Sequence, residues 1–233
     1  MREHRPCVVL TGAGISTESG IPDFRSATGI WAQYDPMEYA HIDAFQRDPE
    51  KVWDFYGKRL AVLGDAEPND GHRALADLEQ RGWVRAVITQ NIDRLHERAG
   101  SCALVEVHGS IRTASCLHCG TVVSMAEVVG LLPVPSCPSC GDVLKPDVVM
   151  FGELLPAAQM ARAEQLAREA GLLLVVGSSL EVYPVAGLPL ETLANGGRLA
   201  IVNRGGTSFD ARASVVVDAA AGETLRGLAA RLP

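Results

Sequence analysis

A glycine-rich stretch near the start of the chain has the residue types that hold a phosphate. It covers residues 11–25, TGAGISTESGIPDFR, and follows the apolar run 8–10. Gly12 and Gly14 lack a β-carbon, so the backbone can turn tightly there and present N–H groups to a pyrophosphate at a helix start. Thr17 replaces the third glycine of the usual dinucleotide fingerprint. The two glycines alone are therefore weak evidence, and an ordinary strand-to-helix turn remains open.

The end of the same stretch adds groups that could close over a bound nucleotide. Residues 20–22, Gly-Ile-Pro, should end any helix that begins at Ala13. Asp23, Phe24 and Arg25 then place an acid, an aromatic ring and a guanidinium beside the loop. We expect these residues to cover a bound nucleotide and to hold it in place.

Polar residues also follow two predicted strands, at 84–89 and 103–107. Gln90, Asn91 and Asp93 come after the first strand, and His108 comes after the second. In doubly wound sheets, ligands bind at the carboxyl ends of the strands, so these side chains should meet at one edge. An imidazole there could act as a general base near neutral pH, although a lone histidine is more often structural.

Four of the six cysteines form two C-x-x-C pairs with the spacing of a zinc ribbon. Cys116 and Cys119 are separated by residues 120–136 from Cys137 and Cys140. Four thiolates complete a tetrahedral shell and leave no open position, so we expect a structural zinc ion rather than a catalytic one. A redox role would require a thioredoxin-like context that two paired motifs do not supply.

Composition and charge exclude several classes of protein. The chain has 233 residues, of which 47% are apolar, with a net charge of -7. An acidic chain is unsuited to wrapping nucleic acid or lying on an anionic membrane, so we expect neither partner. No leader segment or membrane-spanning run is apparent, and the cysteine usage suits a reducing compartment. We expect a cytoplasmic protein, and a monomer.

The alternation of strands and helices predicts an α/β fold, a Rossmann-like doubly wound parallel sheet with a small second domain. Expected strands lie at 8–11, 84–89, 103–107, 172–176, 199–202 and 215–217, and expected helices at 48–63, 72–81, 95–99, 156–170 and 223–232. Residues 145–153 should be extended. The Rossmann-like domain is assigned to 1–27, 64–110 and 145–233. A helical insert at 28–63 and a zinc-ribbon module at 111–144 form the small domain.

Taken together, these motifs resemble the sirtuin family over almost the whole chain. The matching segments are 12–16 (GAGIS), 20–25 (GIPDFR), 89–93 (TQNID), 108–109 (HG), both cysteine pairs, 149–153 (VMFGE) and 177–179 (GSS), in that order. The resemblance implies an enzyme that removes acyl groups from protein lysines. Such enzymes consume NAD as a co-substrate and release nicotinamide and an O-acyl-ADP-ribose.

The resemblance also implies roles for individual residues. His108 is expected to be the general base that deprotonates a ribose hydroxyl, and Asn91 to orient the ribose and a water. Asp93 would receive the nicotinamide amide, Phe24 would cover the cleaved sugar, and Arg25 would bind phosphate. The full set expected to contact NAD is Gly12, Ala13, Gly14, Ser16, Thr17, Phe24, Arg25, Gln90, Asn91, Ile92, Asp93, Gly177, Ser178, Ser179, Asn203 and Ala221.

The same resemblance implies an acylated lysine within an extended peptide as the partner. The peptide is expected to lie between the segments 149–153 and 181–183, pairing through its backbone. Residues expected to contact the peptide or its acyl group are Ala40, Tyr56, Arg59, Val149, Phe151, Gly152, Glu153 and Val182. Core packing is the alternative for the apolar members of this set.

Tyr56 and Arg59 bear on the choice of acyl group. They lie three residues apart on one predicted helix, with Ala40 upstream. This pattern resembles sirtuins that accept succinyl- and malonyl-lysine, in which the tyrosine and arginine bind the acyl carboxylate. Asp23 stands where many members of that class have threonine, so both deacetylation and desuccinylation remain open. The alternative functions are a mono-ADP-ribosyltransferase and a non-enzymatic zinc-ribbon module that senses NAD or nucleic acid, although the net charge of -7 disfavours nucleic acid.

Overall fold

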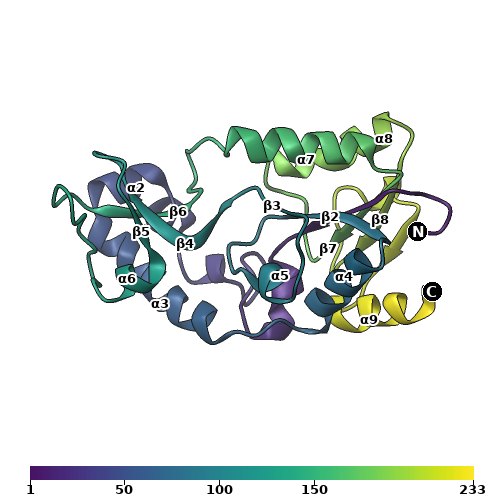
Figure 1. Cartoon of the computed structure of the whole chain (residues 1–233), viewed down its shortest axis with the longest axis horizontal. Coiled ribbons are helices and arrows are strands. Elements are labelled where there is room, and N and C mark those ends of the chain that lie inside the picture. The colour runs from purple at the N-terminus through teal and green to yellow at the C-terminus, as the bar shows by residue number, and fades with distance from the viewer.

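A six-stranded, all-parallel sheet forms the larger part of the computed structural model, which describes residues 1–233 (Figure 1). Its strands are β1 Cys7–Thr11, β2 Val84–Thr89, β3 Leu104–Glu106, β7 Leu172–Val176, β8 Arg198–Val202 and β9 Val215–Val217. The order is β3-β2-β1-β7-β8-β9, so the chain moves outward from β1 and then returns to its other side. This topology confirms the predicted Rossmann-like doubly wound sheet.

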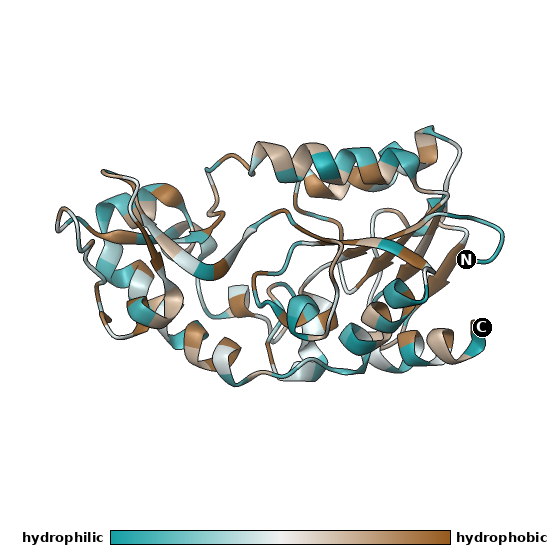
Figure 2. Cartoon of the chain, viewed as in Figure 1, coloured by the Kyte–Doolittle hydropathy of each residue, from teal (hydrophilic) through white to brown (hydrophobic).

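Helices cover both faces of this sheet. The pair α4 Asp70–Gln80 and α9 Ala221–Arg231 lies on one face, and the pair α7 Ala157–Glu169 and α8 Leu188–Ala194 lies on the other (Figure 1). Alternate residues of the central strands supply the two cores. Val9 packs with the α4 and α9 residues, whereas Val8 packs with those of α7 and α8. Both faces are buried, which explains why the strands are continuous apolar runs, the brown arrows of Figure 2.

A second, antiparallel sheet carries the cysteines. Its strands are β4 Gly109–Cys116, β5 Val122–Ser124 and β6 Leu144–Val148, in the order β5-β4-β6, and the short helix α6 Met125–Val129 follows β5. Because β6 pairs with β4, residues 144–148 belong to this sheet. We therefore propose that the larger domain resumes after Val148, rather than at 145 as the sequence suggested.

The helical insert and the small sheet share one core. The insert contains α1 Pro36–Tyr39, α2 Ile42–Arg47 and α3 Pro49–Asp65. The side chain of Asp48 caps α3 by accepting from Lys51 N–H, and Pro49 occupies the first turn, as the sequence predicts. Trp53 is fully buried and donates its indole N–H to Leu144 O at 2.7 Å. This bond ties the insert to β6.

The remaining differences from the expected elements are local. The turn after β1 contains a 3-10 helix, Ala13–Ser19, which ends at Gly20 in a left-handed conformation. Helix α5 covers Leu95–Arg98. The segment expected to be extended to residue 153 leaves the strand at Val148 and turns at Gly152, where φ is +85°. None of the helices is both long and apolar enough to cross a bilayer.

Candidate active site and metal centre

Two glycine turns meet at the carboxyl ends of β1 and β7. Gly12 N–H donates to Val176 O at 3.1 Å, and Gly14 N–H donates to Gly177 O at 2.8 Å. A β-carbon on Gly14 would lie 2.8 Å from Gly177 Cα. These two N–H groups are thus committed to protein carbonyls and are not presented to a phosphate as the sequence suggested. The glycines are needed for close packing of the two turns.

A cavity of about 940 Å³ opens beside these turns and extends toward the helical insert. It brings together every residue that the sequence assigned to catalysis, NAD or substrate. Those residues are Gly12, Ala13, Gly14, Ser16, Thr17, Phe24, Arg25, Ala40, Tyr56, Arg59, Gln90, Asn91, Ile92, Asp93, His108, Val149, Phe151, Gly152, Glu153, Gly177, Ser178, Ser179, Val182, Asn203 and Ala221.

The cavity also includes residues that sequence reasoning missed. Trp31, Phe55 and Leu63 come from the insert, and Arg204 lies in the turn after β8. Arg204 could have been found, because it stands in a glycine-rich turn at a strand end. The aromatic residues gave no such signal, since their pattern equally suits a core.

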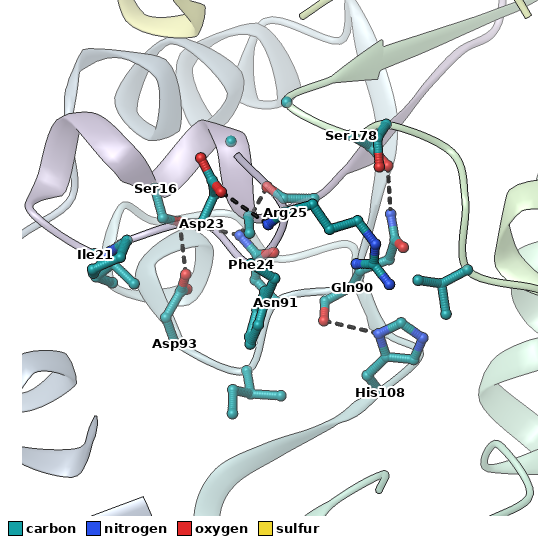
Figure 3. A pocket seen from close by; sticks show the side chains of 18 of the residues that line it. Ser16, Ile21, Asp23, Phe24, Arg25, Gln90, Asn91, Asp93, His108 and Ser178 are labelled. Atoms are coloured by element: carbon teal, nitrogen blue, oxygen red, sulfur yellow. Dashed lines mark hydrogen bonds between the residues drawn. The ribbon is translucent and has the colours of Figure 1, made fainter. Parts of the chain in front are cut away.

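His108 has a defined hydrogen-bonding state (Figure 3). Its Nδ1 lies 3.1 Å from Gln90 O, and a carbonyl can only accept, so Nδ1 carries the proton. The other ring nitrogen, Nε2, is then an acceptor on a side chain that lines the cavity. Burial lowers the pKa of His108 below its ordinary value, the Gln90 bond opposes this, and the charge of Arg25 adds to it. The imidazole is therefore neutral at pH 7 and able to accept a proton.

Ser16 connects the polar residues that follow β1 and β2. Its hydroxyl donates to Asp93 Oδ2 at 2.6 Å and accepts from Asn91 Nδ2 at 3.1 Å. Asn91 Nδ2 also donates to Gly12 O at 3.1 Å, which leaves Oδ1 as the free acceptor of that amide. Burial raises the pKa of Asp93, while the bonds from Ser16 and from Leu95 N–H oppose that shift. Figure 3 shows the bond between Ser16 and Asp93.

Two buried histidines lie behind this network. His72 and His96 are 0% and 1% exposed, and their rings meet edge to face with centroids 4.8 Å apart. His72 Nδ1 accepts from Asn69 N–H, so its Nε2 carries the proton that faces Ser16 Oγ at 3.4 Å. Burial lowers the pKa of His72 to about 4 and the pKa of His96 well below its ordinary value. Both rings are held neutral.

Helix α3 lines the end of the cavity that lies away from the glycine turns. Arg59 places its guanidinium carbon 4.9 Å from the centre of the Phe24 ring and 5.7 Å from that of Phe55. Tyr56 is 7% exposed, and burial raises its pKa to about 12. Burial likewise lowers the pKa of Arg59, with the nearby Tyr56 and Asp93 opposing the shift. Arg59 forms no salt bridge within the chain.

The four paired cysteines converge at the end of β4. Their sulfur atoms all lie within 4.8 Å of one another, and Sγ of Cys116 lies 3.5 Å from Sγ of Cys140. That separation is far longer than a disulfide and close to the tetrahedron edge of about 3.8 Å that Zn–S bonds of about 2.3 Å produce. Gly120 and Gly141 turn with positive φ after each pair. The site fits a zinc ion bound by four thiolates.

Comparison with known proteins agrees with this geometry. The family model described as "Sir2 family" matches residues 12–184. The chain belongs to the Sir2 family. It is 47% identical over 215 residues to NAD-dependent protein deacetylase 1 of Geobacillus kaustophilus, a match covering 91% of this chain and 87% of the relative.

Two further sirtuins are similar over nearly the whole chain. NAD-dependent protein deacylase 2 of Pyrobaculum aerophilum is 48% identical over 221 residues, covering 95% of this chain and 88% of that protein. A solved structure of a Sir2 variant with a deacetylated p53 peptide and 3'-O-acetyl ADP ribose superposes with a TM-score of 0.93 at 43% identity. That match covers 97% of this chain and 92% of the solved one. The sirtuin resemblance predicted from sequence is confirmed.

The cysteine cluster predicts that the small domain requires its metal. Removing zinc with a chelator should expose Trp53, because the free energy of metal binding is part of the folding free energy in so small a sheet. Tryptophan fluorescence during chelation measures the loss, and metal analysis should give one zinc per chain. Cys102→Ser, at the exposed unpaired thiol, is the control and should retain the metal. A metal-free chain with native fluorescence would contradict the assignment.

The buried His72 predicts a loss of stability in acid. The unfolded chain binds a proton near pH 6.5 whereas the folded chain resists it down to about pH 4, so stability falls as the pH drops through this window. Between pH 7 and pH 5 the free energy of unfolding should decrease by about 2 kcal/mol from this group. Urea unfolding of wild type and His72→Gln measures the difference, since glutamine preserves the capping bond. Substituting the exposed His4 by Gln should leave the slope unchanged; an unchanged slope in His72→Gln would refute the assignment.

Proposed function

We propose that this sirtuin is an NAD-dependent protein lysine deacylase. One acyl-lysine amide, one NAD and one water would yield free lysine, nicotinamide and O-acyl-ADP-ribose. The observation that carries the proposal is the state of His108, whose Nδ1 donates to Gln90 O while Nε2 is left as an acceptor in the cavity. The relatives named as NAD-dependent deacetylase and deacylase support it.

Three polar residues of the cavity have a task in this reaction that their contacts allow. Neutral His108 would take the proton of a ribose hydroxyl, which then attacks the acyl carbon. Asn91 Oδ1 would accept from a ribose hydroxyl, because its nitrogen already donates to Gly12 O and Ser16 Oγ. Asp93 is held by Ser16 and would accept from the nicotinamide amide. Holding these groups in place is most of the catalysis.

The peptide would enter between two backbone segments of the cavity. Both Phe151 backbone groups are already used, since its N–H donates to Ala40 O and its carbonyl accepts from Ile42 N–H. The N–H groups of Gly152 and Tyr183, on opposite sides, make no backbone hydrogen bond within the chain. We propose that an extended acyl-peptide pairs with these two groups, which would leave its lysine pointing toward His108.

We further propose that the acyl end accepts succinyl and malonyl groups as well as acetyl. The Arg59 guanidinium is half-buried between aromatic rings and has no carboxylate partner in the chain. A cation in such a position is destabilised until an anion neutralises it. An acyl carboxylate beside Tyr56 and Arg59 would supply that anion.

Product analysis of the His108→Ala variant tests the reaction. Mass spectrometry of wild type with NAD and an acetylated peptide should detect O-acetyl-ADP-ribose. Loss of the base should lower kcat/KM by about 10²–10⁴-fold. Binding of ADP-ribose should survive in the variant, which shows that the cavity is intact. An ADP-ribosylated protein in place of the nucleotide product would instead support the transferase alternative, and no product would favour an NAD sensor.

The acyl preference is tested with matched acetyl and succinyl peptides. Arg59→Met keeps the unbranched apolar part of the side chain and removes the guanidinium, so succinyl kcat/KM should fall by about 10–150-fold, the worth of a charged hydrogen bond. Acetyl turnover should change by far less. Lys58→Met removes the neighbouring charge, which is exposed and bound to Asp54, and serves as the control. A full succinyl rate in Arg59→Met would rule out this pocket.

A further inference from the structure

An ion pair spans the cavity between the NAD and peptide sides. Arg25, which follows the 3-10 helix, places Nε 3.0 Å from Oε2 of Glu181, which follows β7. Both side chains line the cavity and are partly exposed, at 38% and 59%. The pair therefore joins the loop that would cover NAD to the segment that would bind the peptide.

The other acids of the cavity are committed elsewhere. Asp23 Oδ1 accepts from the N–H groups of Arg25 and Ser26, and so shapes the loop. Asp93 accepts from Ser16. Glu153 pairs with the buried ammonium of Lys145 at 2.9 Å. Glu181 is thus the only acid of the cavity that neutralises Arg25.

Only one of the cations that line the cavity has an acidic partner. Three arginines line it, Arg25, Arg59 and Arg204, and Arg25 alone forms a salt bridge. Its charge also reaches His108, whose pKa it helps to lower. On the proposed function, the diphosphate of NAD must lie in the same cavity with two negative charges. The diphosphate and Glu181 then compete for one guanidinium.

We propose that Arg25 exchanges Glu181 for the NAD diphosphate, and that the released Glu181 carboxylate selects peptides with a basic residue beside the acyl-lysine. This inference rests on the proposed deacylase function. Glu181 is the first residue of the segment that ends at Tyr183, and the only other hydrogen bond of its carboxylate is accepted from Ser179 Oγ at 3.3 Å. Tyr183, an exposed residue of the same segment, also lines the cavity and is uncharged. The freed Glu181 carboxylate would therefore favour peptides that carry a positive charge beside the acyl-lysine.

The expected size of the effect follows from the exposure of the pair. Exposed ion pairs contribute about 0–1 kcal/mol, so breaking this one costs NAD up to about fivefold in affinity. Removing the competing carboxylate should therefore raise the affinity for NAD by the same factor. Because the pair is exposed, the effect should shrink as salt concentration rises.

Calorimetric titration with ADP-ribose tests the exchange, since this probe carries the diphosphate but cannot react. Glu181→Gln should bind ADP-ribose about two- to fivefold more tightly than wild type at low salt. Glu191→Gln is the matched control, because Glu191 pairs with Arg168 at 3.4 Å outside the cavity and loses the same charge. Equal affinity in wild type and Glu181→Gln would overturn the exchange but leave the deacylase proposal intact. Failure of wild type to bind ADP-ribose would overturn both.

A peptide pair tests the selection. With saturating NAD, wild type should show a lower KM for an acetyl-lysine peptide carrying arginine next to the modified lysine than for its alanine counterpart. Glu181→Gln should lose that difference in KM between the two peptides. Retention of the full arginine preference in Glu181→Gln would overturn the selection.

Discussion

The contact between the Gly12–Gly14 turn and the Gly177 turn is the constraint on which the rest of the structure depends. A β-carbon on Gly177 would lie 2.2 Å from Ile15 N, and the φ of +60° there suits glycine. This contact holds the carboxyl ends of β1 and β7 together where the chain reverses its direction across the sheet. A crevice opens at that point, and polar residues that follow β1, β2, β3, β7 and β8 line it.

Burial, rather than local charge, sets the protonation of the groups around this crevice. It is the largest cause of the lowered pKa values of His72, His96 and His108 and of the raised pKa of Asp93. Hydrogen bonds then determine which ring nitrogen of each histidine carries the proton and which can accept a hydrogen bond. Gln90 O fixes the tautomer of His108, and Asn69 N–H fixes that of His72. The result is a neutral His108 at the cavity, with the neutral His72 and His96 buried nearby.

The small domain contributes the charge at the far end of the cavity. The core that α3 shares with the cysteine-bearing sheet orients the helix, and the Trp53 bond to β6 secures it. Arg59 then lies beside Phe24, a residue of the loop that follows the 3-10 helix. The cysteine cluster lies at the far end of β4 from His108, so both this strand and the shared core connect it to the cavity.

The sequence by itself determined the features that depend on local pattern. Buried strands are apolar runs followed by turn residues, so the six parallel strands and the residues at their ends, Gln90, His108 and Gly177, could be predicted. The four cysteines are defined by spacing alone. Caps such as Asp48 and Pro49 set where a helix begins, because they satisfy its first N–H groups.

Only the tertiary structure decided the features that depend on partners far apart in the chain. The N–H groups of Gly12 and Gly14 donate to the turn after β7, which no local pattern reveals. The assignment of β6 to the smaller sheet, the proton position on His108 and the pairing of Arg25 with Glu181 have the same origin. Periodicity reports which face of an element is buried, whereas a hydrogen bond or an ion pair depends on where packing brings two distant segments together.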